Sequence, residues 1–284
     1  MAPEVTAGWL TGPPVVPVAA AVLPHPPLLV PELAGAAAPE LSLLRAACQE
    51  ALATVTAAAD LTIIVGDGPV WGVPAPAAPG SFHPYGAEVS VALPALVGLE
   101  LPGLPPPAEL TGLPLSLAVA AHLLDGLDPP PRQLFAASVP RSLGPRAAAA
   151  IGHALGSTGR FGLVAMADLS ACRTERAPGA FRPEAASFDA RVGDAFRTGT
   201  SHHLLALDPT QSADLLVAGR VPLQVLAGAF EGPPARSGRP DEGRGDLHSG
   251  GPGPDNGGLR GRVLYEDAPY GVGYLVALLT RPER

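Results

Sequence analysis

Short apolar runs alternate with longer amphipathic segments along most of this chain. The runs VVPVAAAVL (15–23), LTIIVGDG (61–68), QLFAASV (133–139) and RFGLVAMADLS (160–170) have the length and the β-branched content of buried strands. Between the first two, PELSLLRAACQEALATVTAAA (39–59) places apolar residues at helical spacing, with Pro39 suited to a first helical turn. Strands that alternate with helices predict an α/β domain.

The remaining pattern fills in this architecture. Helices are predicted at 113–127, 145–157, 183–199 and 222–230, with shorter ones at 201–206 and 209–217. Two strands, in RVLYEDAP (262–269) and YGVGYLVALL (270–279), close the sheet, while the proline-rich stretch 69–112 predicts only two short strands, near 87–93 and 96–101. The sequence therefore predicts a single domain over residues 15–280, with a central mixed, mostly parallel sheet flanked by helices.

Two segments depart from this pattern. Residues 1–14 are rich in Gly and Pro and predict a flexible N-terminal extension. Half of residues 232–261 are Gly or Pro, and only Ala235, Leu247 and Leu259 are apolar there. Such a segment buries too little apolar surface to offset the entropy of ordering, so we expect a disordered insertion.

Composition excludes several classes of partner. The chain has 284 residues, 47% of them hydrophobic, and its formal net charge is −8. It has no lysine and no basic stripe, which argues against a nucleic-acid partner. No uninterrupted apolar run reaches the ~18 residues of a membrane span, and no basic residue precedes the first apolar run as in a signal peptide. The chain has only two cysteines, Cys48 and Cys172, so a disulfide framework is not expected. Taken together, these features predict a cytoplasmic protein without a membrane partner.

Polar residues cluster in five segments that follow predicted strands or open helices. These segments are PHPP (24–27), GDGP (66–69), ADLSACR (167–173), AGRVPLQVL (218–226) and APYGVGY (268–274). Since the carboxyl ends of parallel strands meet at one edge of a sheet, where α/β proteins hold ligands, these segments indicate a pocket. Its candidate residues are His25, Asp67, Asp168, Ser170, Arg173 and Arg220.

Taken in this order, the five segments resemble the class III extradiol ring-cleavage dioxygenases, the subunit-B-like superfamily that also includes Memo-type proteins. The resemblance covers roughly residues 15–280. It implies a non-haem Fe(II) held at the strand ends by two histidines and a carboxylate, with open positions for a catecholate and O₂. It also implies a further histidine that acts as acid and base, and a homodimer.

Position by position, this chain keeps little of that site. His25 matches the histidine that follows the first strand, whereas the second loop offers Asp67 and no histidine. Ala171 stands where the acid/base histidine is expected, and Ala218 stands where Memo-type relatives have a cysteine. Loss of an acid/base group alone costs about 10²–10⁴-fold in rate. The resemblance therefore predicts a dioxygenase-like protein whose iron chemistry is altered or lost and whose pocket still takes a small aromatic or other small molecule.

Two other functions are compatible with these residues. In the first, the protein is a metal-dependent enzyme in which His25 is joined by substitute ligands. These would come from Asp67, Asp168, Cys172 or the loop residue His83. Two carboxylates and one imidazole suit a hard divalent cation better than a redox iron. In the second, the protein is a non-enzymatic partner or scaffold whose outer face carries the function.

Other roles, most of them structural, are also open for five of the six candidates. His25 could hydrogen-bond a backbone carbonyl, and Asp67 could stabilise its Gly-Asp-Gly turn. Asp168 and Ser170 could cap the segment that follows them. Arg220 could bind an anion in the pocket or pair with a carboxylate.

Overall fold

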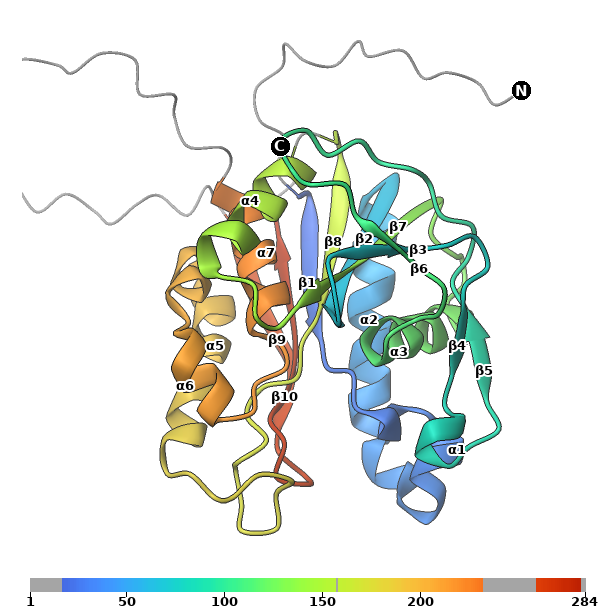
Figure 1. The fold of residues 1–284 in the computed structure, drawn as a ribbon. Helices are drawn as coiled ribbons and strands as arrows, with labels where there is room; N and C mark the ends of the chain where they lie inside the picture. The colour runs from blue at the N-terminus through green and yellow to red at the C-terminus, as the bar shows by residue number, and fades with distance from the viewer. Residues whose placement is uncertain (1–16, 157, 232–258, 282–284) are drawn as a thin grey trace, which may run out of the picture.

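The computed structural model describes residues 17–156, 158–231 and 259–281. Within these residues a large mixed sheet is flanked by helices on both faces (Figure 1). Its strands are β1 (Ala19–Leu23), β2 (Leu61–Gly68), β3 (Gly72–Pro74), β6 (Ala108–Leu110), β7 (Gln133–Pro140), β8 (Phe161–Met166), β9 (Arg260–Asp267) and β10 (Tyr274–Thr280). They lie in the order β6-β3-β7-β2-β8-β1-β10-β9. A separate pair consists of β4 (Pro79–Ser81) and β5 (Ser90–Ala92).

The centre of the sheet is parallel and its edges are not. Strands β7, β2, β8 and β1 run parallel to one another. On one side β10 pairs antiparallel with β1 and β9 with β10, and on the other side β3 pairs antiparallel with β7. The apolar runs predicted this arrangement, because a parallel strand is covered on both faces and carries apolar residues at consecutive positions. In β2, for example, Ile63 and Ile64 point to opposite faces and both are fully buried.

Helices form a layer on each face of the sheet. The α-helices are α1 (Pro31–Ala34), α2 (Ser42–Ala58), α3 (Leu115–Asp125), α4 (Pro145–Leu155), α5 (Glu184–Thr198), α6 (Pro209–Asp214) and α7 (Arg220–Glu231), and the 3₁₀ helices are η1 (Pro27–Leu29), η2 (Gly35–Leu41), η3 (His83–Tyr85) and η4 (Ser201–Ala206). Helices α2 and α3 pack on one face, and α4, α5 and α7 pack on the other. Together they bury the apolar residues of both sheet faces.

Helices α4 and α7 approach each other closely. A Cβ atom added at Gly152 of α4 would lie 2.2 Å from the carbonyl oxygen of Val225, and one added at Gly228 of α7 would lie 2.5 Å from that of Ala149. Only glycine leaves room for this contact at both positions. The backbones of α4 and α7 therefore pack directly against each other.

Most of the predicted elements are present, with informative differences. Strand β2 covers the predicted residues 61–68, and α3, α4, α5 and α7 lie at their predicted places. Pro39 lies in the 3₁₀ helix η2 that leads into α2, so it is not in the first turn of the α-helix as predicted. A strand at 96–101 was wrong, because this stretch makes only an isolated bridge between Leu96 and Leu134.

The boundaries of the predicted flexible segments can be tested only in part. Residues 1–14 and 232–258 lie outside the described residues. The predicted insertion 232–261 extended too far, since Arg260 and Gly261 already pair with β10 as the first residues of β9. No helix in the described part of the chain is both long and apolar enough to cross a membrane.

Candidate functional site

The connections of the sheet diverge between β2 and β8. These strands are neighbours, but the chain leaves β2 toward β3 and β7 and leaves β8 toward β9 at the opposite edge. In open α/β sheets, ligands bind at the carboxyl ends of strands where the chain departs in opposite directions. The described topology therefore locates one preferred position for a site.

His25, Asp67 and Asp168 meet at this position. His25 follows β1, Asp67 is the penultimate residue of β2, and Asp168 follows β8. The Nε2 atom of His25 lies 2.9 Å from Oδ1 of Asp67, and the backbone N–H of His25 donates to Oδ1 of Asp168 at 2.7 Å. The Nδ1 atom of His25 lies 3.8 Å from the same Asp168 oxygen. Among the described residues His25 bonds carboxylates and no backbone carbonyl, and Asp67 does more than stabilise a turn.

Arg141 completes the network from the next strand. It directly follows β7, and its Nε donates to Oδ2 of Asp67 at 2.6 Å. Asp67 thus accepts from an imidazole on one oxygen and from a guanidinium on the other. We call His25, Asp67, Asp168 and Arg141 the edge network. Its two carboxylates can be balanced by one imidazolium and one guanidinium.

The charges of the edge network favour an ionised His25–Asp67 pair. Burial alone would lower the pKa of His25, but the carboxylates of Asp168 and Asp67 outweigh it and hold that pKa above its ordinary value. Burial acts to raise the pKa of Asp67, yet His25 and Arg141 together lower it. For Asp168, burial prevails over the attraction of His25 and raises the pKa.

The members of the edge network differ in their exposure to solvent. The side chains of Arg141 and Asp168 are 64% and 16% exposed, while that of His25 is 3% exposed. Two hollows on the described surface lie elsewhere: one is lined by Trp71, Leu101 and Phe135 among others, and the other by residues that include Arg191 and Asp208. None of the six residues predicted to form the pocket lines either hollow.

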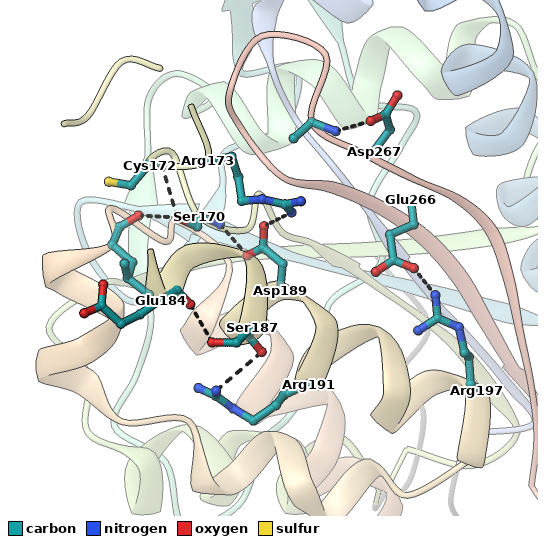
Figure 2. A network of polar contacts seen from close by, with 12 residues as sticks. Ser170, Cys172, Arg173, Glu184, Ser187, Asp189, Arg191, Arg197, Glu266 and Asp267 are labelled. Carbon is teal, nitrogen blue, oxygen red and sulfur yellow. Dashed lines mark hydrogen bonds and ion pairs between the residues drawn. The ribbon is translucent and has the colours of Figure 1, made fainter. Parts of the chain in front are cut away.

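Ser170 and Arg173 belong to a second cluster, drawn in Figure 2. The backbone N–H of Ser170 donates to Oδ1 of Asp189 at 3.0 Å, and Nη1 of Arg173 donates to Oδ2 of Asp189 at 2.8 Å. Asp189 projects from α5, and burial raises its pKa although Arg173 and the Ser170 N–H partly offset this. The hydroxyl of Ser170 accepts from the backbone N–H of Cys172 at 3.1 Å, which is a local turn bond. This cluster ties the loop after β8 to α5.

Arg220 holds the backbone of the β7–α4 loop. It is buried, and its Nη2 donates to the carbonyl of Leu143 at 2.9 Å and to the carbonyl of Arg141. Its Nη1 donates to Oε1 of Gln224, one turn further along α7, at 2.8 Å. These contacts are neither the bound anion nor the paired carboxylate that the sequence left open. Arg220 instead supports the backbone that carries Arg141.

The residues of the edge network do not fit an iron site of the kind that the resemblance implies. A facial triad needs three donors that converge on one point. Asp67 approaches Nε2 of His25 while Asp168 lies beside Nδ1, and these two nitrogens point away from each other across the ring. The second oxygen of Asp67 is engaged by Arg141. Within the described ranges, no group of three or more His, Cys, Asp or Glu residues is placed to hold a metal ion.

Two of the four proposed substitute ligands, His83 and Cys172, lie apart from the edge network. His83 is exposed, with Nε2 3.2 Å from a carboxylate oxygen of Glu88. Cys172 is buried, and its Sγ lies 4.0 Å from the carbonyl oxygen of Asp214. Only Asp67 and Asp168, of the four predicted substitutes, have contacts with His25.

Arg141 and Asp189 are the polar residues that the sequence analysis missed. Arg141 comes two residues after the strand run at 133–139, a placement close to those that identified Asp67 and Asp168. Asp189 lies on the apolar face of its amphipathic helix, with Ala185, Val192 and Phe196 at helical spacing. A carboxylate on such a face needs a buried partner, which is a signal for a structural ion pair.

Comparison with known proteins finds a relative of the fold but gives no information on the site. No protein-family model matches the sequence, and no curated protein is significantly similar to it. Among solved structures, an uncharacterized protein from Escherichia coli K12, JW3007, is similar, with a TM-score of 0.57 and 15% sequence identity over 93% of this chain and 99% of that one. At this identity the likeness shows a shared fold, so this chain and the E. coli protein have the same overall α/β architecture.

Proposed function

We propose that this protein is a relative of the class III extradiol dioxygenases that no longer uses iron and binds a small molecule at the carboxyl edge of its sheet. The observation that carries the proposal is the engagement of His25 Nε2 by Asp67, which is itself held by Arg141. In the family that the sequence resembles, the first-strand histidine is a metal ligand. Here its counterpart is a member of an ion-pair network that is balanced without a metal cation.

The position of the edge network supports a small-molecule role. It lies at the carboxyl ends of β2 and β8, where the chain departs in opposite directions, and two of its members reach solvent. A buried histidine between two carboxylates is also costlier to maintain than an apolar core, because its charges lose hydration. Strongly perturbed titratable groups gather at functional sites more often than elsewhere.

Iron binding tests this proposal directly. Metal-free protein would be titrated with Fe(II) under anaerobic conditions, and bound iron would be measured for the wild type, His25→Ala and the control His83→Ala. We expect no stoichiometric iron in any of the three, and no oxygen uptake with a panel of catechols, because three donors do not converge. One iron per chain that is lost only in His25→Ala would overturn the proposal in favour of a metal-dependent enzyme with substitute ligands.

Ligand binding separates the proposal from a scaffold. Ligand-observed NMR with fragment-sized aromatics should detect saturable binding to the metal-free wild type that weakens in Asp168→Ala. Failure of every fragment to bind would favour a protein whose outer face carries the function.

A further inference from the structure

We propose that Arg141 anchors the carboxylate of a small organic acid at the carboxyl edge of the sheet. The inference rests on the proposed function, because it names the chemical class of ligand for that same site. It starts from the way in which Arg141 uses its nitrogens.

Arg141 keeps the outer edge of its guanidinium free. Its Nε is the atom that bonds Asp67, and its two terminal nitrogens make no hydrogen bond to any other residue that the structure describes. The side chain is 64% exposed, so this edge faces solvent. Two parallel N–H groups on a planar guanidinium match the two oxygens of a carboxylate.

Arg141 is also fixed before any ligand arrives. Its carbonyl accepts from the guanidinium of Arg220, a side chain that is only 5% exposed, and its own Nε is held by a largely buried carboxylate. A surface arginine ordinarily loses rotamer freedom when it binds, and this loss weakens binding. Because Arg141 is restrained at both its backbone and its side chain, most of that loss has already occurred on folding.

The surrounding charges favour a single negative charge on the ligand. Asp67 neutralises part of the Arg141 charge, and the Asp168 carboxyl belongs to the same edge network. A phosphate, with a charge near −2, meets more repulsion from these carboxyls than a carboxylate does. The geometry and the charge therefore point to a monocarboxylic acid.

The test compares two ligands of the same shape. Benzoate and benzamide differ in charge at the group that Arg141 would hold, and inorganic phosphate serves as the competing anion. Dissociation constants would be measured by ligand-observed NMR for the wild type, Arg141→Gln, Arg141→Lys and the control Arg132→Gln. Arg132 is a matched control because it also pairs with an aspartate beside β7, at the opposite end of the strand.

We expect wild-type protein to bind benzoate at least about tenfold more tightly than benzamide. Arg141→Gln should remove this preference, Arg141→Lys should keep only part of it because the fork is lost, and Arg132→Gln should leave it unchanged. Equal binding of benzoate and benzamide, or phosphate competing as well as benzoate, would overturn the carboxylate assignment. If benzamide binds in an Asp168-dependent manner, that result leaves the proposed small-molecule site intact; if neither ligand binds, both proposals fail.

Discussion

The two ends of the β2–β7 strand pair carry the same kind of ion pair in very different surroundings. At the amino ends, Nη1 of Arg132 lies 2.6 Å from Asp60; at the carboxyl ends, Nε of Arg141 lies 2.6 Å from Asp67. The residue types and the distances match. The carboxylate of Asp60 is 65% exposed, whereas that of Asp67 is 11% exposed and also contacts His25.

Burial of the carboxylate makes the difference between these pairs. An exposed pair in water contributes about 0–1 kcal/mol, because solvent screens it and side-chain entropy opposes it. A carboxylate that is largely removed from water depends on its partners for the hydration that it has lost. Distance alone therefore does not show which ion pair the fold requires.

The largest effect is expected when the carboxylates of the two pairs are removed one at a time. Asp67→Asn removes the carboxylate that lies 2.9 Å from Nε2 of the buried His25, and loss of one member of a buried pair costs about 3–5 kcal/mol. Asp60→Asn should cost less than about 1 kcal/mol. Urea unfolding of both variants at neutral pH measures the free energies, and equal losses would mean that the edge network contributes no more than a surface pair.

A smaller effect is expected from the arginines that bond backbone carbonyls. Arg220→Met leaves the carbonyls of Arg141 and Leu143 without a buried donor, which costs about 1–3 kcal/mol. Arg160 offers a matched control, since it is exposed and its Nη2 donates to the carbonyl of Ala58 at 2.9 Å. Arg160→Met should change the unfolding free energy by less than about 0.5 kcal/mol.

Unfolding curves of Arg220→Met and Arg160→Met would decide this second comparison. If the two losses were alike, the β7–α4 loop would hold its shape without Arg220. The anchoring of Arg141 from its backbone would then lose its support.

The fold could be predicted where the apolar pattern is long. Strand β2 was found at its true bounds, because eight residues that are mostly β-branched or apolar fit a strand that is covered on both faces. The three-residue strands β3 and β6 have no such pattern. Strand β3 forms by pairing with β7, and β6 forms by pairing with β3. A local window of sequence does not contain these tertiary pairings.

The sequence predicted where the site lies, but it predicted only some of the residues that form it. His25, Asp67 and Asp168 each end a parallel strand, and this rule brought them together correctly. Ser170 and Arg173 lie on the same loop as Asp168 but bond Asp189. A loop turns its successive side chains to different neighbours, so sequence proximity did not show that two clusters share one segment.

The smallest expected effect is in the pH dependence of stability, which should differ between the two ends of the β2–β7 strand pair. Because Asp168 and Asp67 raise the pKa of His25 in the folded state, the native protein binds more protons than the unfolded chain above pH ~6.5, the ordinary value. The contribution of His25 is therefore fully present below that pH and is lost as the pH rises through the folded-state pKa. Urea unfolding from pH 6 to 9 should show a free energy that declines in the wild type.

This decline of the unfolding free energy with pH should be shallower in His25→Gln. It should be unchanged in Asp60→Asn and His83→Gln, because Asp60 pairs with Arg132 and His83 with Glu88 rather than with His25. Asp168, whose pKa is also raised, acts with the same sign, because it too holds its proton more firmly in the folded state. The stabilisation that comes from the lowered pKa of Asp67 is lost only when the pH falls through that pKa, outside this range. Parallel pH curves for the wild type and His25→Gln would show that folding does not raise the pKa of His25, and the carboxylates of the edge network would then not stabilise its protonated form.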